Sequence, residues 1–137
     1  MTEKVHFLPV DLSIHRSQVI DLNVEHMEWV AKEASKHFKI DIFAIVGSSP
    51  REYIANTIDK MLSDISSHGI YYLVELEGTI ISMGALRQIK EKTGEIKRMY
   101  IRLSHRGKGY GKALLQQLLQ KAKEFGYIPS ISILHDS

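Results

Sequence analysis

The residues best suited to chemistry in this sequence form one basic, glycine-rich segment, residues 106–112. Glycines alternate in it with larger side chains, in the order Arg106, Gly107, Lys108, Gly109, Tyr110, Gly111 and Lys112. Glycine has no side chain, so backbone N–H groups can approach an anion closely. A helix predicted to begin at Lys112 would add unpaired N–H groups and the positive end of its dipole. The segment therefore predicts a phosphate-binding turn.

The spacing of these residues decides between several kinds of phosphate and nucleic-acid site. A P-loop requires Ser or Thr after its Gly-Lys pair, but Ala113 follows Gly111-Lys112. A dinucleotide-binding fingerprint fails because Lys112 stands where its third glycine belongs. Residues 108–111 match the first half of the RNP motif of RNA-binding sheets, and the match then breaks at Lys112. None of these three motifs is complete.

A different motif fits residues 106–111. Arg-Gly-Lys-Gly-Tyr-Gly matches the pattern R/Q-x-x-G-x-G/A, which is typical of the GNAT family of N-acetyltransferases. Residues 95–101, Glu-Ile-Lys-Arg-Met-Tyr-Ile, resemble the fourth strand of that family. The sequence therefore resembles this family over essentially its whole length. A basic glycine turn that only joins a strand to a helix is the simpler alternative.

The composition excludes several classes of protein. With 137 residues, 44% of them hydrophobic and 25% charged, the chain is expected to form a single domain, residues 1–137. The absence of cysteine excludes disulfides, thiolate metal sites and a cysteine nucleophile. A net charge of +2, no signal peptide and no long apolar run favour a cytoplasmic enzyme without nucleic-acid or membrane partners. The seven histidines show no ligand spacing, so no metal is expected.

The apolar pattern predicts helices and strands that agree with this resemblance. The expected elements are a strand over 5–10, a helix over 13–35, a helix capped by Ser49-Pro50, a hairpin of strands 70–76 and 79–86, a polar return over 88–94, a strand over 95–101, a helix from Lys112 and a strand over 128–134. The predicted fold class is α/β (α+β). Its mixed sheet combines an antiparallel meander with one parallel crossover strand, and helices cover both faces.

The resemblance implies that acetyl-CoA is the co-substrate and that the acceptor is a primary amine of a small molecule or peptide. Backbone N–H groups from Arg106 to Lys112 would hold the pyrophosphate, with Arg106 and Lys108 as charge partners. The open edge of Met99-Tyr100-Ile101 would pair with the amides of the pantetheine arm, as a further strand would. Residues 38–48 would form a loop on the substrate side.

The acceptor amine requires a base, because an alkyl amine with a pKa of about 10.4 is almost fully protonated at neutral pH. Glu95 matches the position of the carboxylate that several relatives use, and is the candidate general base. The alternative is a surface glutamate that pairs with Lys97 or Arg98. His26, Glu28 and Trp29 could face a substrate, but their pattern favours surface and core positions, and all histidines are interpreted as structural or surface residues.

The C-terminal region departs from the family pattern. Family members usually continue past the last strand into a helix and two more strands, whereas this sequence stops at Ser137. No general acid is assigned, because the tyrosine that relatives often use lies in that segment. A homodimer through strand 128–134 is expected to cover its apolar edge. Two alternatives remain: a catalytically impaired acyl-CoA-binding protein, and a small RNA-binding module that uses residues 97–112.

Overall fold

A computed structural model of the chain describes residues 4–41, 44 and 47–131. Its elements are β1 (Val5–Pro9), α1 (Leu12–Phe38), α3 (Pro50–Ser66), β2 (Ile70–Leu76), β3 (Thr79–Lys90), β4 (Thr93–Ile101), the short 3-10 helix η1 (Leu103–His105), α4 (Tyr110–Phe125) and β5 (Ile128–Ile131). Their order is the one that the sequence predicts.

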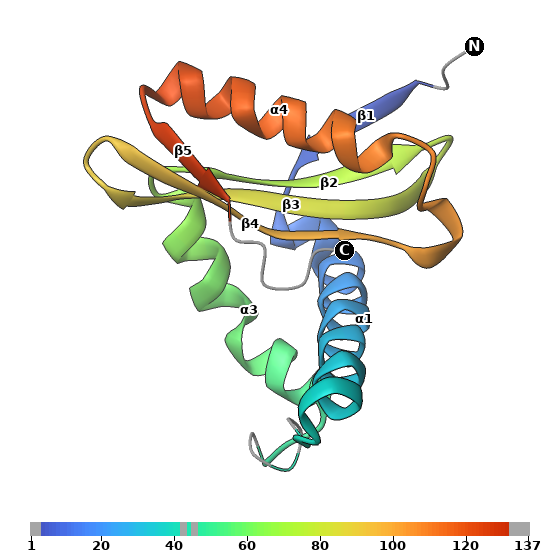
Figure 1. The fold of residues 1–137 in the computed structure, drawn as a ribbon. Coiled ribbons are helices and arrows are strands. Elements are labelled where there is room, and N and C mark those ends of the chain that lie inside the picture. The colour runs from blue at the N-terminus through green and yellow to red at the C-terminus, as the bar shows by residue number, and fades with distance from the viewer. Residues whose placement is uncertain (1–3, 42–43, 45–46, 132–137) are drawn as a thin grey trace.

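The sheet is mixed and has the order β1-β2-β3-β4-β5. Strands β1 to β4 form an antiparallel meander, and β5 joins β4 in parallel after the crossover through α4. Helix α4 covers one face of the sheet, and α1 and α3 cover the other (Figure 1). The predicted fold class, with its parallel crossover strand and helices on both faces, is confirmed.

Several boundaries differ from the prediction. Strand β3 continues to Lys90 and β4 begins at Thr93, so a turn of two residues replaces the polar return expected over 88–94. Polar side chains are compatible with a strand where the hairpin leaves the core, because the backbone ladder still pairs there. Helix α4 begins at Tyr110, two residues before the predicted start. Residues 42–43, 45–46 and 132–134, which belong to the predicted substrate-side loop and last strand, lie outside the described residues.

Each face of the sheet has its own apolar core. Val19, Leu22, Ile58, Leu73 and Met83 are buried between the sheet and the pair α1 and α3. The second core lies under α4 and contains Ile81, Leu86, Ile96, Leu114 and Leu118. No helix in the described part of the chain is both long enough and apolar enough to cross a membrane. The two cores hold β3 and β4 rigidly between the helices, which fixes the side chains on β4.

A bulge interrupts β4 at Arg98. Lys97 pairs with Ala85 and Tyr100 pairs with Met83, so two residues of β4 lie opposite one residue of β3. Arg98 has a φ of 58°, a left-handed conformation that a non-glycine residue adopts only where the surroundings hold it. Its Nη1 donates a hydrogen bond to Oδ1 of Asn23 on α1, at 3.3 Å. A bulge redirects the side chains that follow it, and this one lies beside the candidate site.

We predict that Asn23→Leu lowers the free energy of unfolding by about 1–3 kcal/mol, because it leaves buried polar groups without partners. Asn23 is 2% exposed, and its Nδ2 donates to the carbonyl of Val19 and to the hydroxyl of Tyr71, at 2.8 and 2.9 Å. Urea denaturation measures the change. Tyr71→Phe combined with Asn23→Leu should cost less than the two single changes added together, and strict additivity would contradict this coupling.

Candidate active site

A cavity of about 290 Å³ lies where the end of β4 meets the start of α4 and the middle of α1. Its lining residues are His26, Trp29, Met99, Tyr100, Ile101, His105, Arg106, Gly107, Gly109, Gly111 and Lys112. Of the residues predicted to bind the cofactor, all but Lys108 and Tyr110 are therefore brought to one cavity. Glu95 is not among its lining residues.

The glycine turn has the backbone geometry of an anion-binding loop. Gly107 and Gly109 have φ values of 75° and 88°, in the left-handed region that favours glycine. Gly109 caps α4, and the N–H of Ala113 donates to its carbonyl at 3.1 Å, which closes the first turn of the helix. The N–H groups of Gly111 and Lys112 precede that bond, so they have no acceptor within the helix. These donors and the helix dipole favour a phosphate at the cavity wall.

Gly111 also keeps the wall of the cavity narrow. A Cβ at this position would lie 3.3 Å from Cδ1 of Ile101, which belongs to the neighbouring strand. A larger side chain here would therefore crowd both the strand and the cavity. Without side chains at these glycines, a pyrophosphate can approach the backbone N–H groups closely, so the residues present fit acetyl-CoA.

Among the described strands, none pairs with the outer edge of β4 beyond Ile96. Within the described residues, β5 pairs with β4 only over Thr93–Ile96. Arg102 donates its N–H to Ile81 on β3 at 2.9 Å, so the alternation of the ladder turns the backbone groups of Ile101 towards the outer edge. Nε of Arg106 already donates to the Ile101 carbonyl at 2.8 Å. The edge therefore offers the Ile101 N–H to a ligand, while its carbonyl is occupied.

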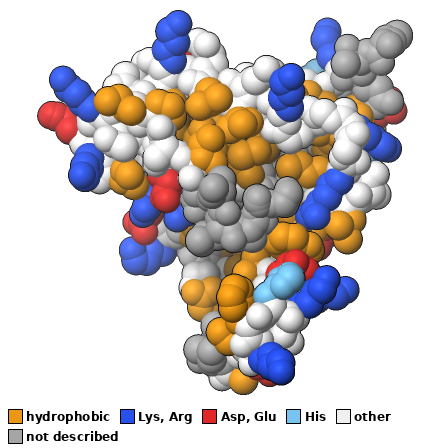
Figure 2. Space-filling view, in the orientation of Figure 1, with side chains coloured by type: hydrophobic (Ala, Val, Ile, Leu, Met, Phe, Trp, Pro, Cys, Tyr) orange, Lys and Arg blue, Asp and Glu red, His pale blue; other side chains and the backbone are white. Residues whose placement is uncertain are grey.

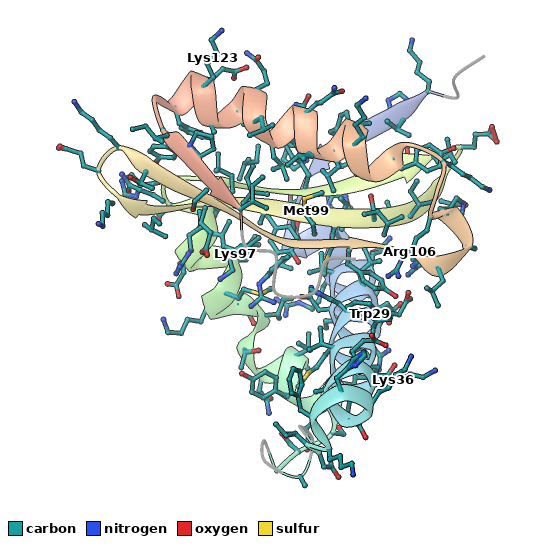
Figure 3. All side chains as sticks on the ribbon, viewed as in Figure 1. Trp29, Lys36, Lys97, Met99, Arg106 and Lys123 are labelled. Carbon is teal, nitrogen blue, oxygen red and sulfur yellow. The ribbon has the colours of Figure 1, made fainter. Side chains whose placement is uncertain are left out.

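Arg106 is held inside the site by aromatic rings. Its guanidinium carbon lies 5.4 Å from the centroid of the Trp29 ring and 5.3 Å from that of the Tyr100 ring. Such contacts are cation–π interactions. Figure 3 shows Trp29 on α1 below the loop that carries Arg106. The sequence predicts Arg106 as a charge partner of the pyrophosphate. In the structure Arg106 lines the cavity and also joins α1 to the end of β4, and Lys112 lines the cavity as well.

Two residues of α1 that the sequence analysis placed in surface or core positions, His26 and Trp29, line the cavity. His26 stacks on Tyr100, with ring centroids 5.3 Å apart. The two residues are three positions apart and therefore share one face of the helix. That spacing was visible in the sequence, but nothing there told which face of α1 meets β4. Glu28, by contrast, is exposed.

The hydroxyl of Tyr100 points to a polar group on α1. It donates to Oε1 of Glu25 at 3.5 Å, and Oε2 of Glu25 pairs with Arg102 at 3.2 Å. Burial, together with the negative charge of Glu25, raises the pKa of Tyr100. The hydroxyl is therefore protonated at neutral pH and can act as a hydrogen-bond donor.

Glu95 lies in a cationic cluster on the face of the sheet that α3 covers. Its Oε1 accepts from Nη2 of Arg87 at 3.1 Å and lies 3.9 Å from Nζ of Lys97. The side chain is 24% exposed, so solvent or a ligand can still reach the carboxylate. The pairing with Lys97 that the sequence suggested is present, and Arg87 is an additional partner that the sequence did not reveal.

Solved structures with similar folds include acetyltransferases. The PaiA N-acetyltransferase of Thermoplasma acidophilum, in complex with coenzyme A, superposes with a TM-score of 0.68 and 18% identity over 97% of this chain and 81% of that one. Glucosamine-6-phosphate N-acetyltransferase of Arabidopsis thaliana superposes with a TM-score of 0.61 and 18% identity, over 95% of this chain and 82% of that one. At these identities, the likeness is one of fold.

Sequence comparison adds a family assignment. N-acetyltransferase family 8 member 2 of Rattus norvegicus is 32% identical over 89 residues, which is 58% of this chain and 39% of the relative. N-acetyltransferase 8F1 of the same species is 27% identical over 93 residues, 61% of this chain and 42% of the relative. The matches thus span about two-fifths of each curated relative. Residues 27–136 match the acetyltransferase (GNAT) family, so most of the chain, including its cavity and glycine turn, belongs to this family.

Proposed function

We propose that the protein is an N-acetyltransferase that transfers an acetyl group from acetyl-CoA to a primary amine of a small molecule or peptide. The observation that carries the proposal is the cavity at the start of α4, where the glycine turn meets the part of the β4 edge that no described strand covers. Membership of the acetyltransferase family and the coenzyme A bound to the Thermoplasma structure support it.

Different lining residues would bind different parts of acetyl-CoA. The N–H groups of Gly111 and Lys112 and the Lys112 ammonium would bind the pyrophosphate, and the N–H of Ile101 would bind an amide of the pantetheine arm. Bound acetyl-CoA supplies a thioester: the amine nitrogen bonds to the acyl carbon, the C–S bond breaks, and the amine proton is lost as coenzyme A leaves as a thiol. Direct attack fits a chain without cysteine.

We propose that Glu95 accepts the amine proton, directly or through water. Its carboxylate is fixed by Arg87 at 3.1 Å and stays partly accessible on the side of the sheet away from α4. A proton relayed from the acceptor amine to Glu95 through water would leave the neutral nucleophile. The contact between Arg87 and Oε1 holds the carboxylate in place.

The function is tested by the release of coenzyme A thiol from acetyl-CoA over a library of primary amines. We expect acetyl-CoA to raise the melting temperature and at least one amine class to give turnover. Stabilisation by acetyl-CoA without turnover for any amine would favour the alternative of an impaired acyl-CoA-binding protein. Stabilisation by a single-stranded oligonucleotide, with none by acetyl-CoA, would instead favour RNA binding.

We also propose a homodimer through β5. This strand lies at the edge of the sheet, and its Ile128 and Ile131 are 70% and 44% exposed. Figure 2 shows apolar side chains gathered over β5 and the adjoining side of α4. Unpaired strand edges and exposed apolar patches are places where a second copy can join. We predict a dimer by light scattering coupled to size exclusion at tens of micromolar, and a monomer for Ile128→Lys combined with Ile131→Lys. A monomer in both cases would contradict this.

A further inference from the structure

Two further cavities lie on the face of the sheet opposite α4. One, of about 290 Å³, is lined by residues of α1 and α3 together with Arg98, and the other, of about 230 Å³, lies between α3 and the strands β3 and β4. They share Thr57, Met61 and Arg98, so they form one continuous groove. His26 lines both this groove and the acetyl-CoA cavity, so the two cavities adjoin at this side chain.

The end of the groove along β3 and β4 carries an excess of positive charge. Arg87, Lys97 and Arg98 line it, and Glu95 is the carboxylate that contacts two of them. A second pair, Lys60 and Asp64, neutralises itself at 2.9 Å. Burial and the nearby guanidinium groups of Arg87 and Arg98 lower the pKa of Lys97, and the opposing effect of Glu95 does not cancel this. The described side chains at this end of the groove therefore carry a net positive charge even with Glu95 counted.

The hydrogen bonds of Arg87 and Arg98 also favour an anion in the groove. The Nε atoms of Arg87 and Arg98 are buried and have no hydrogen-bond partner within the described part of the chain. With respect to the described residues, each arginine uses only part of its planar set of donors, since Arg87 contacts Glu95 and Arg98 contacts Asn23. A buried N–H of a charged group without an acceptor is costly. Carboxylate and phosphate oxygens are the acceptors that the arginine fork fits best.

The other end of the groove is apolar. Its lining between the two helices consists mainly of Met27, Val30, Tyr53, Ile54 and Met61. This end is suited to an aliphatic or aromatic body, because burying apolar area there is favourable and methionine side chains adapt to different shapes. An acceptor that fills the groove therefore needs both an apolar part and a charged group.

We infer that the acceptor is a primary amine that carries an anionic group, a carboxylate or a phosphate, on an apolar body, and that Arg87, Lys97 and Arg98 bind the anion. This inference rests on the proposed acetyl transfer, because it assigns the groove to the acceptor. In this arrangement the apolar body lies between α1 and α3, and the amine is directed past His26 towards the acetyl-CoA cavity. A neutral amine of the same shape would leave the excess positive charge of the cluster uncompensated.

Matched amines test the charge requirement. L-phenylalanine and L-phenylalaninamide differ in the carboxylate, while tyramine O-phosphate and tyramine differ in the phosphate. Thiol release with acetyl-CoA gives kcat/KM for each. We expect the anionic member of at least one pair to be favoured by at least about tenfold, the ratio that one charge-assisted hydrogen bond provides. The pair that shows the preference distinguishes a carboxylate from a phosphate. In the first pair, intrinsic reactivity opposes the expected result, because the amide has the less basic amine.

Arginine variants test which residues carry the preference. Arg98→Gln should lower kcat/KM for the anionic amine by about 10–100-fold and change that of its neutral analogue by less than about threefold. Arg51→Gln is the matched control: Arg51 lies on α3, pairs with Asp21 at 2.9 Å, and lines neither cavity of the groove. A general loss of positive charge would affect both variants equally.

The outcomes separate this inference from the proposed function. Acetylation of neutral and anionic amines at equal rates overturns the inference and leaves the acetyltransferase intact. If no amine is acetylated, the proposed function fails, and saturation-transfer NMR on the full chain then decides the inference. Binding of phenylalanine or tyramine O-phosphate that is lost in Arg98→Gln supports the anion site. Absence of binding, or binding that Arg98→Gln leaves unchanged, overturns it.

Discussion

Gly109→Val should abolish the stabilisation of the protein by acetyl-CoA. A ligand present at one hundred times its dissociation constant contributes about 2.7 kcal/mol, which raises the melting temperature of a domain of this size by on the order of 10 °C. Gly109 forms the N-cap of α4, and a side chain there would extend into open space at the mouth of the cavity, where the phosphates must approach the backbone. We expect the shift to fall below about 2 °C in thermal denaturation.

Gly111→Val should have the same effect for a different reason, since its Cβ would lie 3.3 Å from Ile101 and its methyl groups would enter the cavity. A control is needed for backbone strain at Gly109, where φ is 88° and a side chain costs about 1–2 kcal/mol. Gly126→Val provides it: Gly126 ends the same helix with a φ of 80°, has open space around it, and lies outside the cavity. That variant should melt lower yet keep the full acetyl-CoA shift. A normal shift in both cavity variants would refute the phosphate site.

The order of elements could be predicted because each signal was local. The pair Glu77-Gly78 has two positive φ values, 49° and 84°, as the hairpin between β2 and β3 requires. Ser49 caps α3 by accepting from the N–H of Glu52 at 3.2 Å, as the pattern before Pro50 indicated. Such signals depend on a few neighbouring residues, so one sequence is enough to read them. Lys90 and its polar neighbours were missed because tertiary pairing overrode their weak strand preference.

The parts of the candidate site that are close in sequence could be predicted, but the contacts between segments far apart in sequence could not. The residues of the glycine turn and of β4 are close in sequence, and the motif names them together. Trp29 is far from Arg106 in sequence, and their contact depends on how α1 lies against β4. The cationic cluster depends likewise on the register that places Arg87 opposite Glu95. The bulge at Arg98 had no visible signal, because its left-handed conformation occurs at a residue that rarely adopts it.

Glu95→Gln should lower kcat by about 10²–10⁴-fold, the usual contribution of a general base, while leaving the affinity for acetyl-CoA unchanged. The amide oxygen can still accept from Arg87, whose bond to Glu95 is 3.1 Å, so packing in the cluster is preserved. A base must be unprotonated to act, so we expect the wild-type rate to fall at acidic pH. The variant should lack this acid limb, and the pH dependence of kcat measures it.

His26 is the matched comparison, because its ring lines both the acetyl-CoA cavity and the acceptor groove, and an imidazole can act as a general base. If Glu95 is the base, His26→Gln should retain the acid limb and change mainly KM. If the limb disappears in His26→Gln and persists in Glu95→Gln, the proton is accepted on α1 and Glu95 only balances the charge of Arg87 and Lys97. If Glu95 has only a structural role, Glu95→Gln should lower the melting temperature and leave the pH profile of kcat unchanged. Charge balance in the cluster affects folding and not the protonation of the amine.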